Sequence, residues 1–170
     1  MNILYVMSVR VKKNYLVFRG KKYKSVIGAN GLTRNKVEGD LSTPCGSFKI
    51  ESIMYRDDKV KGLTSSLPLY KIRKNDGWCD DVNHPSYNKR IQFPFAFNAE
   101  HLFREDSLYD MVCVLNYNTS NIVKGKGSAI FLHVASTELD PTAGCIAMVK
   151  GDLYFLIKNI RLEENRFNID

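Results

Sequence analysis

Short runs of strand-forming residues, separated by turn-forming residues, constrain the fold of this 170-residue chain more than any other feature. Residues 3–11, 15–19 and 23–28 are rich in Val, Ile, Tyr and Phe, and Lys-Asn and Arg-Gly steps interrupt them. Residues 111–117 and 129–135 are almost continuously apolar, which is typical of buried central strands. This pattern predicts a mainly β fold.

Helical patterns are sparse by comparison. Apolar residues at positions 153, 156, 157 and 160 have the spacing of one helical face, which predicts a helix over residues 150–160. Residues 99–106 are a second candidate for a short helix, and residues 47–55 alternate loosely, as a half-buried strand does. No repeat, low-complexity tract or linker divides the chain. We therefore expect one domain over residues 1–170, a β-rich α+β fold with few short helices.

The net charge of +7 at pH 7 bears on the class of partner. A charge of this sign favours nucleic acid, an anionic membrane surface or an acidic polymer such as peptidoglycan. The basic residues form small scattered groups, so a solvated basic face is the alternative interpretation. Closely spaced aromatic and basic strand residues, typical of single-strand binders, are missing, so nucleic acid is not expected.

No apolar segment reaches the roughly 18 residues of a membrane span, so stable membrane insertion is not expected. The first apolar run is short and soon followed by charge, so we expect no secretory signal peptide in this sequence.

The four cysteines are widely spaced along the chain, at Cys45, Cys79, Cys113 and Cys145. The sequence contains no Cys-x-x-Cys pair and no close Cys/His cluster, so a zinc site is not expected. The cysteines are also too sparse for a disulfide scaffold. We expect mostly free thiols, with Cys113 buried inside its apolar run.

Residues 128–148 hold the side chains best suited to chemistry. An apolar strand carries His133, an Asp-Pro turn follows, and Cys145 comes directly after Gly144, twelve positions beyond the histidine. The chain can therefore return and bring His133 and Cys145 together. The alternative is a hydrogen-bonded structural histidine and an ordinary Gly-Cys pair.

The pairing matters because the thiolate, not the thiol, is the nucleophile. A free cysteine has a pKa of about 8.5, and a neighbouring imidazole lowers it and accepts the proton. Gly144 has no Cβ to obstruct an approaching carbonyl. The backbone amides of Gly144 and Cys145 are candidate oxyanion donors, of which a single one contributes on the order of 3 kcal/mol.

Residues 57–97 lose regular pattern and accumulate Gly, Pro, Asn and Asp, as a functional loop does. The candidates for substrate contact are the only tryptophan and polar residues near it: Trp78, Asp80, Asp81, Tyr87 and Asn88. The alternative is a tryptophan that fills the core beside polar residues that cap the loop. We expect His84 and His101 at the surface.

Two separated motifs resemble those of the L,D-transpeptidase (YkuD-type) family. Residues 128–148 have a strand-borne histidine, a loop, and Thr-Ala-Gly-Cys followed by an aliphatic residue. Residues 38–48, E-G-D-L-S-T-P-C-G-S-F, resemble the family's Gly-Asp, Thr-Pro-x-Gly and Phe pattern. The resemblance is closest to a compact branch, which shares G-W-C-D-D…Y-N over 77–88, L-Y-D over 108–110 and G-S-A-I-F-L-H over 127–133.

This resemblance implies a mixed β-sandwich or barrel that acts on peptidoglycan stem peptides in the bacterial cell envelope (the periplasm). Family members cut an L,D bond, form a thioester on cysteine and pass the acyl group to an amine, with no metal or organic cofactor. Cys145 would be the nucleophile and His133 the base. With water as the acceptor, the same pair gives an L,D-carboxypeptidase or another peptidoglycan hydrolase. A third interpretation is a catalytically idle wall-binding module.

The chain also departs from the commoner family pattern. Ala143 stands where a histidine usually precedes the glycine, and Ala147 where an arginine often follows the cysteine. The loop from His133 to Cys145 is also shorter. These departures bear on the choice of acceptor and the substrate register. In residues 43–46 the Thr-Pro-x-Gly order predicts a tight turn that helps to define the fold.

Overall fold

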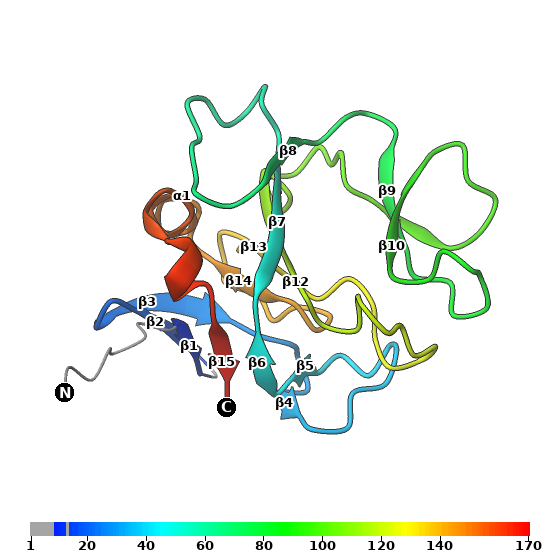
Figure 1. Ribbon diagram of the computed structural model, residues 1–170, viewed down its shortest axis with the longest axis horizontal. Coiled ribbons are helices and arrows are strands. Elements are labelled where there is room, and N and C mark those ends of the chain that lie inside the picture. Colours follow the sequence, from blue (N-terminus) through cyan, green and yellow to red (C-terminus); the bar gives the residue numbers. More distant parts are fainter. Residues whose placement is uncertain (1–8, 13) are drawn as a thin grey trace.

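The computed structural model describes residues 9–12 and 14–170 (Figure 1). The described residues lie mainly in β-strands, with one α-helix, α1 (Lys150–Asn159), and one short 3₁₀ helix, η1 (Leu162–Glu164). The mainly β fold expected from the sequence is therefore confirmed. The predicted helix over 150–160 is also confirmed, to within one residue.

Ten of the described strands form one curled sheet, in the order β6-β15-β1-β2-β3-β14-β13-β12-β7-β8. Their bounds are β1 (Val9–Val11), β2 (Tyr15–Phe18), β3 (Lys21–Val26), β6 (Gly46–Phe48), β7 (Ile50–Tyr55), β8 (Leu69–Lys71), β12 (Met111–Leu115), β13 (Phe131–Val134), β14 (Ile146–Met148) and β15 (Phe167–Ile169). Strand β7 continues β6 after one intervening residue (Figure 1). Because β6 pairs with β15 while β7 pairs with β12, this segment closes the sheet on itself in the manner of a barrel.

Five further described strands lie outside this sheet. β9 (Asp76–Cys79), β10 (Lys89–Gln92) and β11 (Ala99–His101) form a three-stranded sheet in the order β10-β9-β11, to one side of the curled sheet in Figure 1. β4 (Leu32–Thr33) and β5 (Thr43–Pro44) form a short parallel pair. The region expected to be irregular thus contributes β8, β9 and β10 between long loops.

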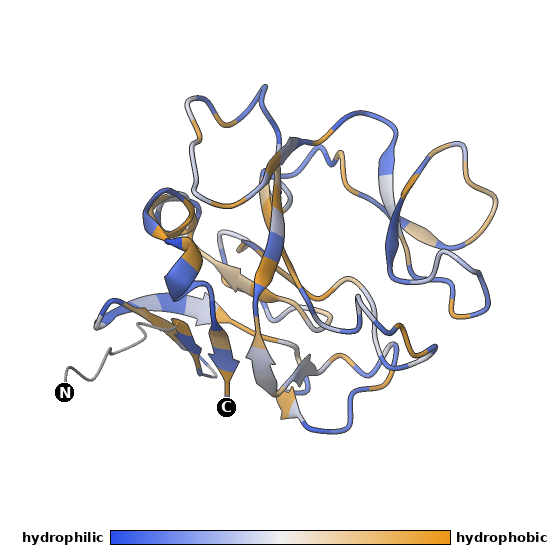
Figure 2. Cartoon of the chain, in the orientation of Figure 1, coloured by the Kyte–Doolittle hydropathy of each residue, from blue (hydrophilic) through white to orange (hydrophobic). Residues whose placement is uncertain are grey.

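Strand β12 is buried along its whole length because it separates two apolar clusters. Cys113 and its neighbours at alternate positions face the main core, which α1 helps to cover, whereas Val112 and Val114 face a second cluster that contains Trp78. Figure 2 shows hydrophobic and hydrophilic colours following one another along β7, and hydrophilic colours over much of the surrounding loops. The burial expected for Cys113 is confirmed, and all four cysteines, which lie in the described part of the chain, are free thiols.

The predicted short helix over 99–106 is wrong. Ala99–His101 is instead strand β11, whose residue Ala99 pairs with Cys79 of β9. The residues after it form bends and turns. Pairing with a strand from elsewhere in the chain satisfies the backbone of β11, and this tertiary contact overrides a weak local preference.

The predicted tight turn over residues 43–46 is also wrong, because this segment is extended. Thr43 lies in β5, the Cys45 N–H donates to the Thr33 carbonyl at 2.7 Å, and Gly46 begins β6. Gly46 has a φ of +148°, and a Cβ there would lie 2.6 Å from the ring of Phe48. The glycine is required by this contact within a strand rather than by a turn.

The strand predicted over residues 3–11 is described only from Val9, and its earlier part lies outside the described residues. No helix in the described part of the chain is long and apolar enough to cross a membrane.

Candidate active site

Two neighbouring parallel strands position His133 and Cys145. His133 lies in β13 in register with Ala147 of β14, and Cys145 directly precedes β14. Since Cys145 is two residues before Ala147, its side chain is on the same face of the sheet as that of His133. Both side chains line one cavity of about 280 Å³. The structure therefore brings together the two residues singled out from the sequence.

A backbone carbonyl orients the imidazole of His133. Its Nδ1 lies 2.8 Å from the carbonyl oxygen of Val134. A carbonyl only accepts hydrogen bonds, so Nδ1 carries the proton and Nε2 is left as the basic nitrogen. The ring packs edge-on against Tyr109, with 5.3 Å between ring centroids. Burial lowers the pKa of His133 and outweighs the hydrogen bond to Val134, which acts in the opposite direction, so the neutral imidazole is favoured.

The thiol of Cys145 is enclosed by backbone groups. Its Sγ donates to the Ala129 carbonyl at 3.1 Å and accepts from the Phe131 N–H at 3.4 Å. Burial raises the pKa of Cys145 to about 12, and the negative charge of Glu100 contributes in the same direction. Both shifts favour a neutral thiol and a neutral imidazole over a thiolate–imidazolium pair.

The turn before Cys145 has little free space. Gly144 has a φ of +141°, and a Cβ there would lie 3.0 Å from the Ser42 carbonyl oxygen. The Gly144 N–H donates to Thr142 Oγ1 at 3.1 Å, whose hydroxyl donates to the Cys145 carbonyl at 2.6 Å. The N–H of Cys145, in contrast, has no hydrogen-bond acceptor among the described residues. Of the two expected oxyanion donors, the Cys145 amide is thus free and the Gly144 amide is engaged.

A second cavity, of about 180 Å³, also reaches Cys145. Glu100, Ala143 and Cys145 line both cavities, whereas His133 lines only the larger one. The smaller cavity has a charged wall that includes Lys36, Glu38 and Asp80. Cys145 is therefore reached from two cavities that differ in their walls.

Three of the predicted loop residues are buried and line neither cavity. Trp78, Tyr87 and Asn88 are 7%, 1% and 3% exposed. The Trp78 Nε1–H and the Ala129 N–H both donate to Asn88 Oδ1, each at 2.9 Å. The Tyr87 hydroxyl donates to Glu38 and accepts from the Gly127 N–H. This network holds Ala129, the residue whose carbonyl accepts from the Cys145 thiol.

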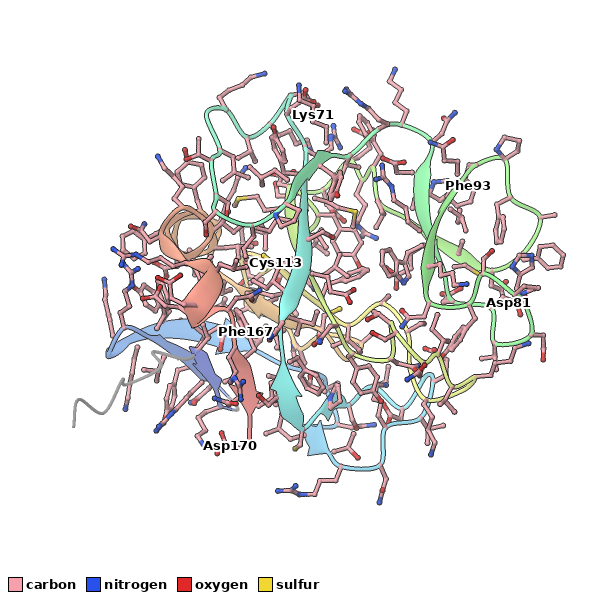
Figure 3. The ribbon with its side chains drawn as sticks, in the orientation of Figure 1. Lys71, Asp81, Phe93, Cys113, Phe167 and Asp170 are labelled. Carbon is pink, nitrogen blue, oxygen red and sulfur yellow. The ribbon has the colours of Figure 1, made fainter. Side chains whose placement is uncertain are left out.

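The two adjacent aspartates have different surroundings. Asp80 lines the smaller cavity. Asp81 lines neither cavity, and its Oδ1 accepts from the Asn83 N–H at 2.9 Å within its own loop. Figure 3 shows Asp81 near the outer edge of the molecule, away from Cys113 in the main core. Of the histidines expected at the surface, His101 is exposed and His84 is half-buried beside Phe97.

Several site residues were not singled out from the sequence, namely Lys36, Glu38, Glu100, Arg104 and Tyr109. Glu38 precedes the Gly-Asp motif and Tyr109 belongs to the L-Y-D segment, so proximity to a motif was a usable signal for these two. Glu100 had no such signal, because its partner Tyr109 belongs to a different segment and only the fold brings the two together.

A mainly β fold with a histidine in one strand, a cysteine directly before the neighbouring strand and a cavity lined by both has the layout of a thiol-dependent enzyme domain. The YkuD family, described as the L,D-transpeptidase catalytic domain, matches residues 5–166, and the chain belongs to this family. Its members act on peptidoglycan peptides and are usually associated with the cell wall.

Comparison with individual proteins adds little to the family assignment. No curated protein matches the chain. The solved structure of Bdellovibrio bacteriovorus Bd1075 is similar, with a TM-score of 0.49 and 17% sequence identity over 96% of this chain. The match covers 47% of that chain, so this protein spans about half the length of Bd1075.

Proposed function

We propose that this protein performs acyl transfer on peptidoglycan stem peptides, with Cys145 as the nucleophile and His133 as the general base. One observation carries the proposal: the two side chains share a face of the sheet and a cavity, and the Val134 carbonyl leaves Nε2 of His133 available as the base. The family, which acts on peptidoglycan, supplies the substrate class.

The steps follow from these positions. Nε2 of His133 takes the thiol proton as Sγ attacks the peptide carbonyl, and the Cys145 N–H donates to the developing oxyanion. The imidazolium returns the proton to the leaving amine as the C–N bond breaks, which leaves a thioester. An acceptor amine, deprotonated by His133, then attacks the thioester and releases the thiol. Before the first step the S–H must rotate away from the Ala129 carbonyl, to which it donates at rest.

Other predicted residues have supporting roles in this proposal. Trp78, Tyr87 and Asn88 act through hydrogen bonds that hold Ala129 and Gly127 rather than through the substrate. Asp80 contacts the substrate from the smaller cavity, and Asp81 caps its loop. Gly144 leaves space at the nucleophile turn. We also propose that residues 1–170 act as one catalytic domain in the cell envelope, facing the periplasm.

Hydrolysis is the second candidate function, because water in place of the amine gives an L,D-carboxypeptidase or another peptidoglycan hydrolase. The departures at Ala143 and Ala147 leave small side chains near Cys145. The acceptor of the acyl group, an amine or water, then decides between transfer and hydrolysis. A catalytically idle wall-binding module is the third candidate.

Mass spectrometry of the protein incubated with stem tetrapeptides, and separately with a carbapenem, tests the proposal. We expect an acyl adduct on Cys145, and release or exchange of the terminal D-amino acid. Cys145→Ala should abolish both, and His133→Ala should reduce turnover by about 10²-fold or more. Cys45→Ser, which changes the other half-buried thiol, is the matched control and should retain activity.

The products distinguish the candidates. Exchange with an added amino acid identifies a transferase, and release alone identifies a hydrolase. Wall binding by a folded protein without any adduct or turnover would overturn the proposal in favour of the idle module.

A further inference from the structure

The smaller cavity beside Cys145 carries three carboxylates from three separate parts of the chain. Glu38 lies between β4 and β5, Asp80 follows β9, and Glu100 lies in β11. Burial raises the pKa of both Asp80 and Glu100, and the charge of Glu38 raises each of them further. The cavity therefore brings three acidic side chains close enough to act on one another.

Two polar oxygen atoms in the cavity wall lack a partner. Ser128 is 7% exposed, and its Oγ has no hydrogen-bond partner among the described residues; Asp80 Oδ1 is likewise buried and unpartnered. The single proton of the nearby Tyr87 hydroxyl is donated to Glu38, so this hydroxyl has no proton to donate to Ser128 Oγ. Buried polar atoms without partners are costly, so these two point to a ligand that donates hydrogen bonds.

Lys36 is the cation in this wall, and it forms an ion pair with Asp40. Its Nζ donates to Asp40 Oδ1 at 2.5 Å and to the Val37 carbonyl at 2.9 Å. Lys36 therefore donates its hydrogen bonds to Asp40 and Val37 rather than to the three cavity carboxylates.

The arrangement does not suit a metal ion. Within the described part of the chain, no three His, Cys, Asp or Glu side chains lie close enough together to hold one. An ammonium group fits better, because its three N–H donors diverge and can reach acceptors spread around a cavity of about 180 Å³.

We propose that this cavity is a subsite for an ammonium group of the substrate, next to the carbonyl that Cys145 attacks. The ammonium group donates to Asp80 Oδ1 and Ser128 Oγ and is held in the field of Glu38 and Glu100. This subsite deepens the proposed function and rests on it for the identity of the reacting bond. It selects peptides or acceptors with a free amine near that bond over acetylated or uncharged analogues.

The bound ammonium group would also affect the nucleophile. After burial, the charge of Glu100 is the next cause of the raised pKa of Cys145. A cation in the cavity offsets that charge, which favours loss of the thiol proton to His133. Occupancy of the subsite and activation of Cys145 are therefore coupled.

Charge-selective labelling of Cys145 tests the subsite without any peptidoglycan. In a Cys45→Ser background, the rates of reaction with 2-aminoethyl and 2-sulfonatoethyl methanethiosulfonate are measured by mass spectrometry and divided by those of free cysteine. We expect the cationic reagent to be favoured by about tenfold or more. Asp80→Asn and Ser128→Ala should each reduce this preference at least about threefold.

Asp81→Asn is the matched control, because it removes the same charge one residue away but outside the cavity. Its preference for the cationic reagent should stay near that of the parent protein. Equal corrected rates for the two reagents would overturn the proposal, as would an undiminished preference in both Asp80→Asn and Ser128→Ala. Protection of Cys145 by millimolar Ca²⁺ equal to that by ethylamine would overturn it in favour of a metal site.

Two peptide assays then identify which reactant supplies the amine. Loss of turnover on acetylating a side-chain amine of the stem peptide places the ammonium group on the acyl donor. Loss of exchange alone, with a charged acceptor replaced by an uncharged one, places it on the acceptor. Charge-selective labelling without turnover of any stem peptide would support the subsite and contradict the proposed function. The failure of the subsite and the failure of the proposed function can therefore be told apart.

Discussion

The hydroxyl of Thr43 joins two segments that are 101 residues apart in the chain. It accepts a hydrogen bond from the Gly28 N–H at 2.8 Å and donates one to the Gly144 carbonyl, also at 2.8 Å. The upstream Thr-Pro motif is therefore in direct contact with the turn that carries Cys145. The position of Cys145 therefore depends on both motifs of the sequence at once.

Removing this hydroxyl should misplace the nucleophile turn. Thr43→Val keeps the side-chain shape but leaves the buried Gly28 N–H and Gly144 carbonyl unpaired, at a cost of about 1–3 kcal/mol in unfolding free energy. We expect kcat/KM to fall by about 10–100-fold, measured beside urea unfolding curves. Thr43→Ser retains the hydroxyl and should stay within about threefold of the parent. Equal activity in the Val and Ser variants would show that the contact is dispensable.

Gly144 should not tolerate a side chain. Gly144→Ala places a Cβ 3.0 Å from the Ser42 carbonyl oxygen at a φ of +141°, so we expect a loss of about 1–3 kcal/mol in stability and a large loss of Cys145 acylation. Gly151→Ala is the control, because Gly151 lies in the first turn of α1 with open space around it. That change should be neutral or stabilise by up to about 1 kcal/mol. Thermal unfolding and adduct formation measure both effects, and normal acylation in Gly144→Ala would contradict this account.

Asn88 should contribute to stability rather than to substrate affinity. Its Oδ1 accepts from Trp78 and Ala129, and its Nδ2 donates to the Asn118 carbonyl at 2.8 Å. Asn88→Ala should therefore destabilise the protein by about 2–4 kcal/mol. Asn88 has a φ of +58°, which glycine adopts freely and alanine adopts only with strain. Asn88→Gly therefore loses the side-chain hydrogen bonds without the backbone strain that Asn88→Ala adds. Chemical denaturation measures stability, and a raised KM with unchanged stability would instead identify Asn88 as a substrate contact.

We expect His133 to stop acting as a base only at acid pH. Burial lowers the pKa of His133 below its ordinary value of 6.5, so the imidazole is neutral above that lowered pKa and becomes protonated as the pH falls through it. We expect the acid limb of kcat/KM to lie below pH 6.5. Burial also raises the pKa of Cys145 to about 12, so alkylation of Cys145 by iodoacetamide should still be rising above pH 9. An alkylation rate that reaches a plateau near pH 7 would instead indicate a thiolate paired with protonated His133.

Patterns of apolar residues correctly predicted the strands and the helix whose buried positions follow a regular spacing along the chain. The continuous apolar runs became β12 and β13, and the helical spacing after residue 150 became α1. The prediction failed at residues 99–106 and 43–46, where strands outside each segment supply the hydrogen bonds. Partners of that kind leave no periodic signal in the segment itself.

The candidate site divides in the same way. Spacing and motif singled out His133, Gly144 and Cys145, because β13, its loop and β14 are consecutive in the chain and bring these residues together. The loop residues near Trp78 were grouped by sequence proximity. The structure separates them, with Trp78 and Asn88 in a buried network and Asp80 at the cavity.

The sequence by itself thus determined the class of fold, the family and the Cys–His pair, all of which depend on residues close together or on motifs in order. Only the tertiary structure decided the protonation and the charge around that pair. The raised pKa of Cys145 results from burial, and the carboxylates of Glu38, Asp80 and Glu100 lie beside it because the fold brings distant segments together. Desolvation and Coulomb interactions act through space, and no order of residues along the chain specifies those distances.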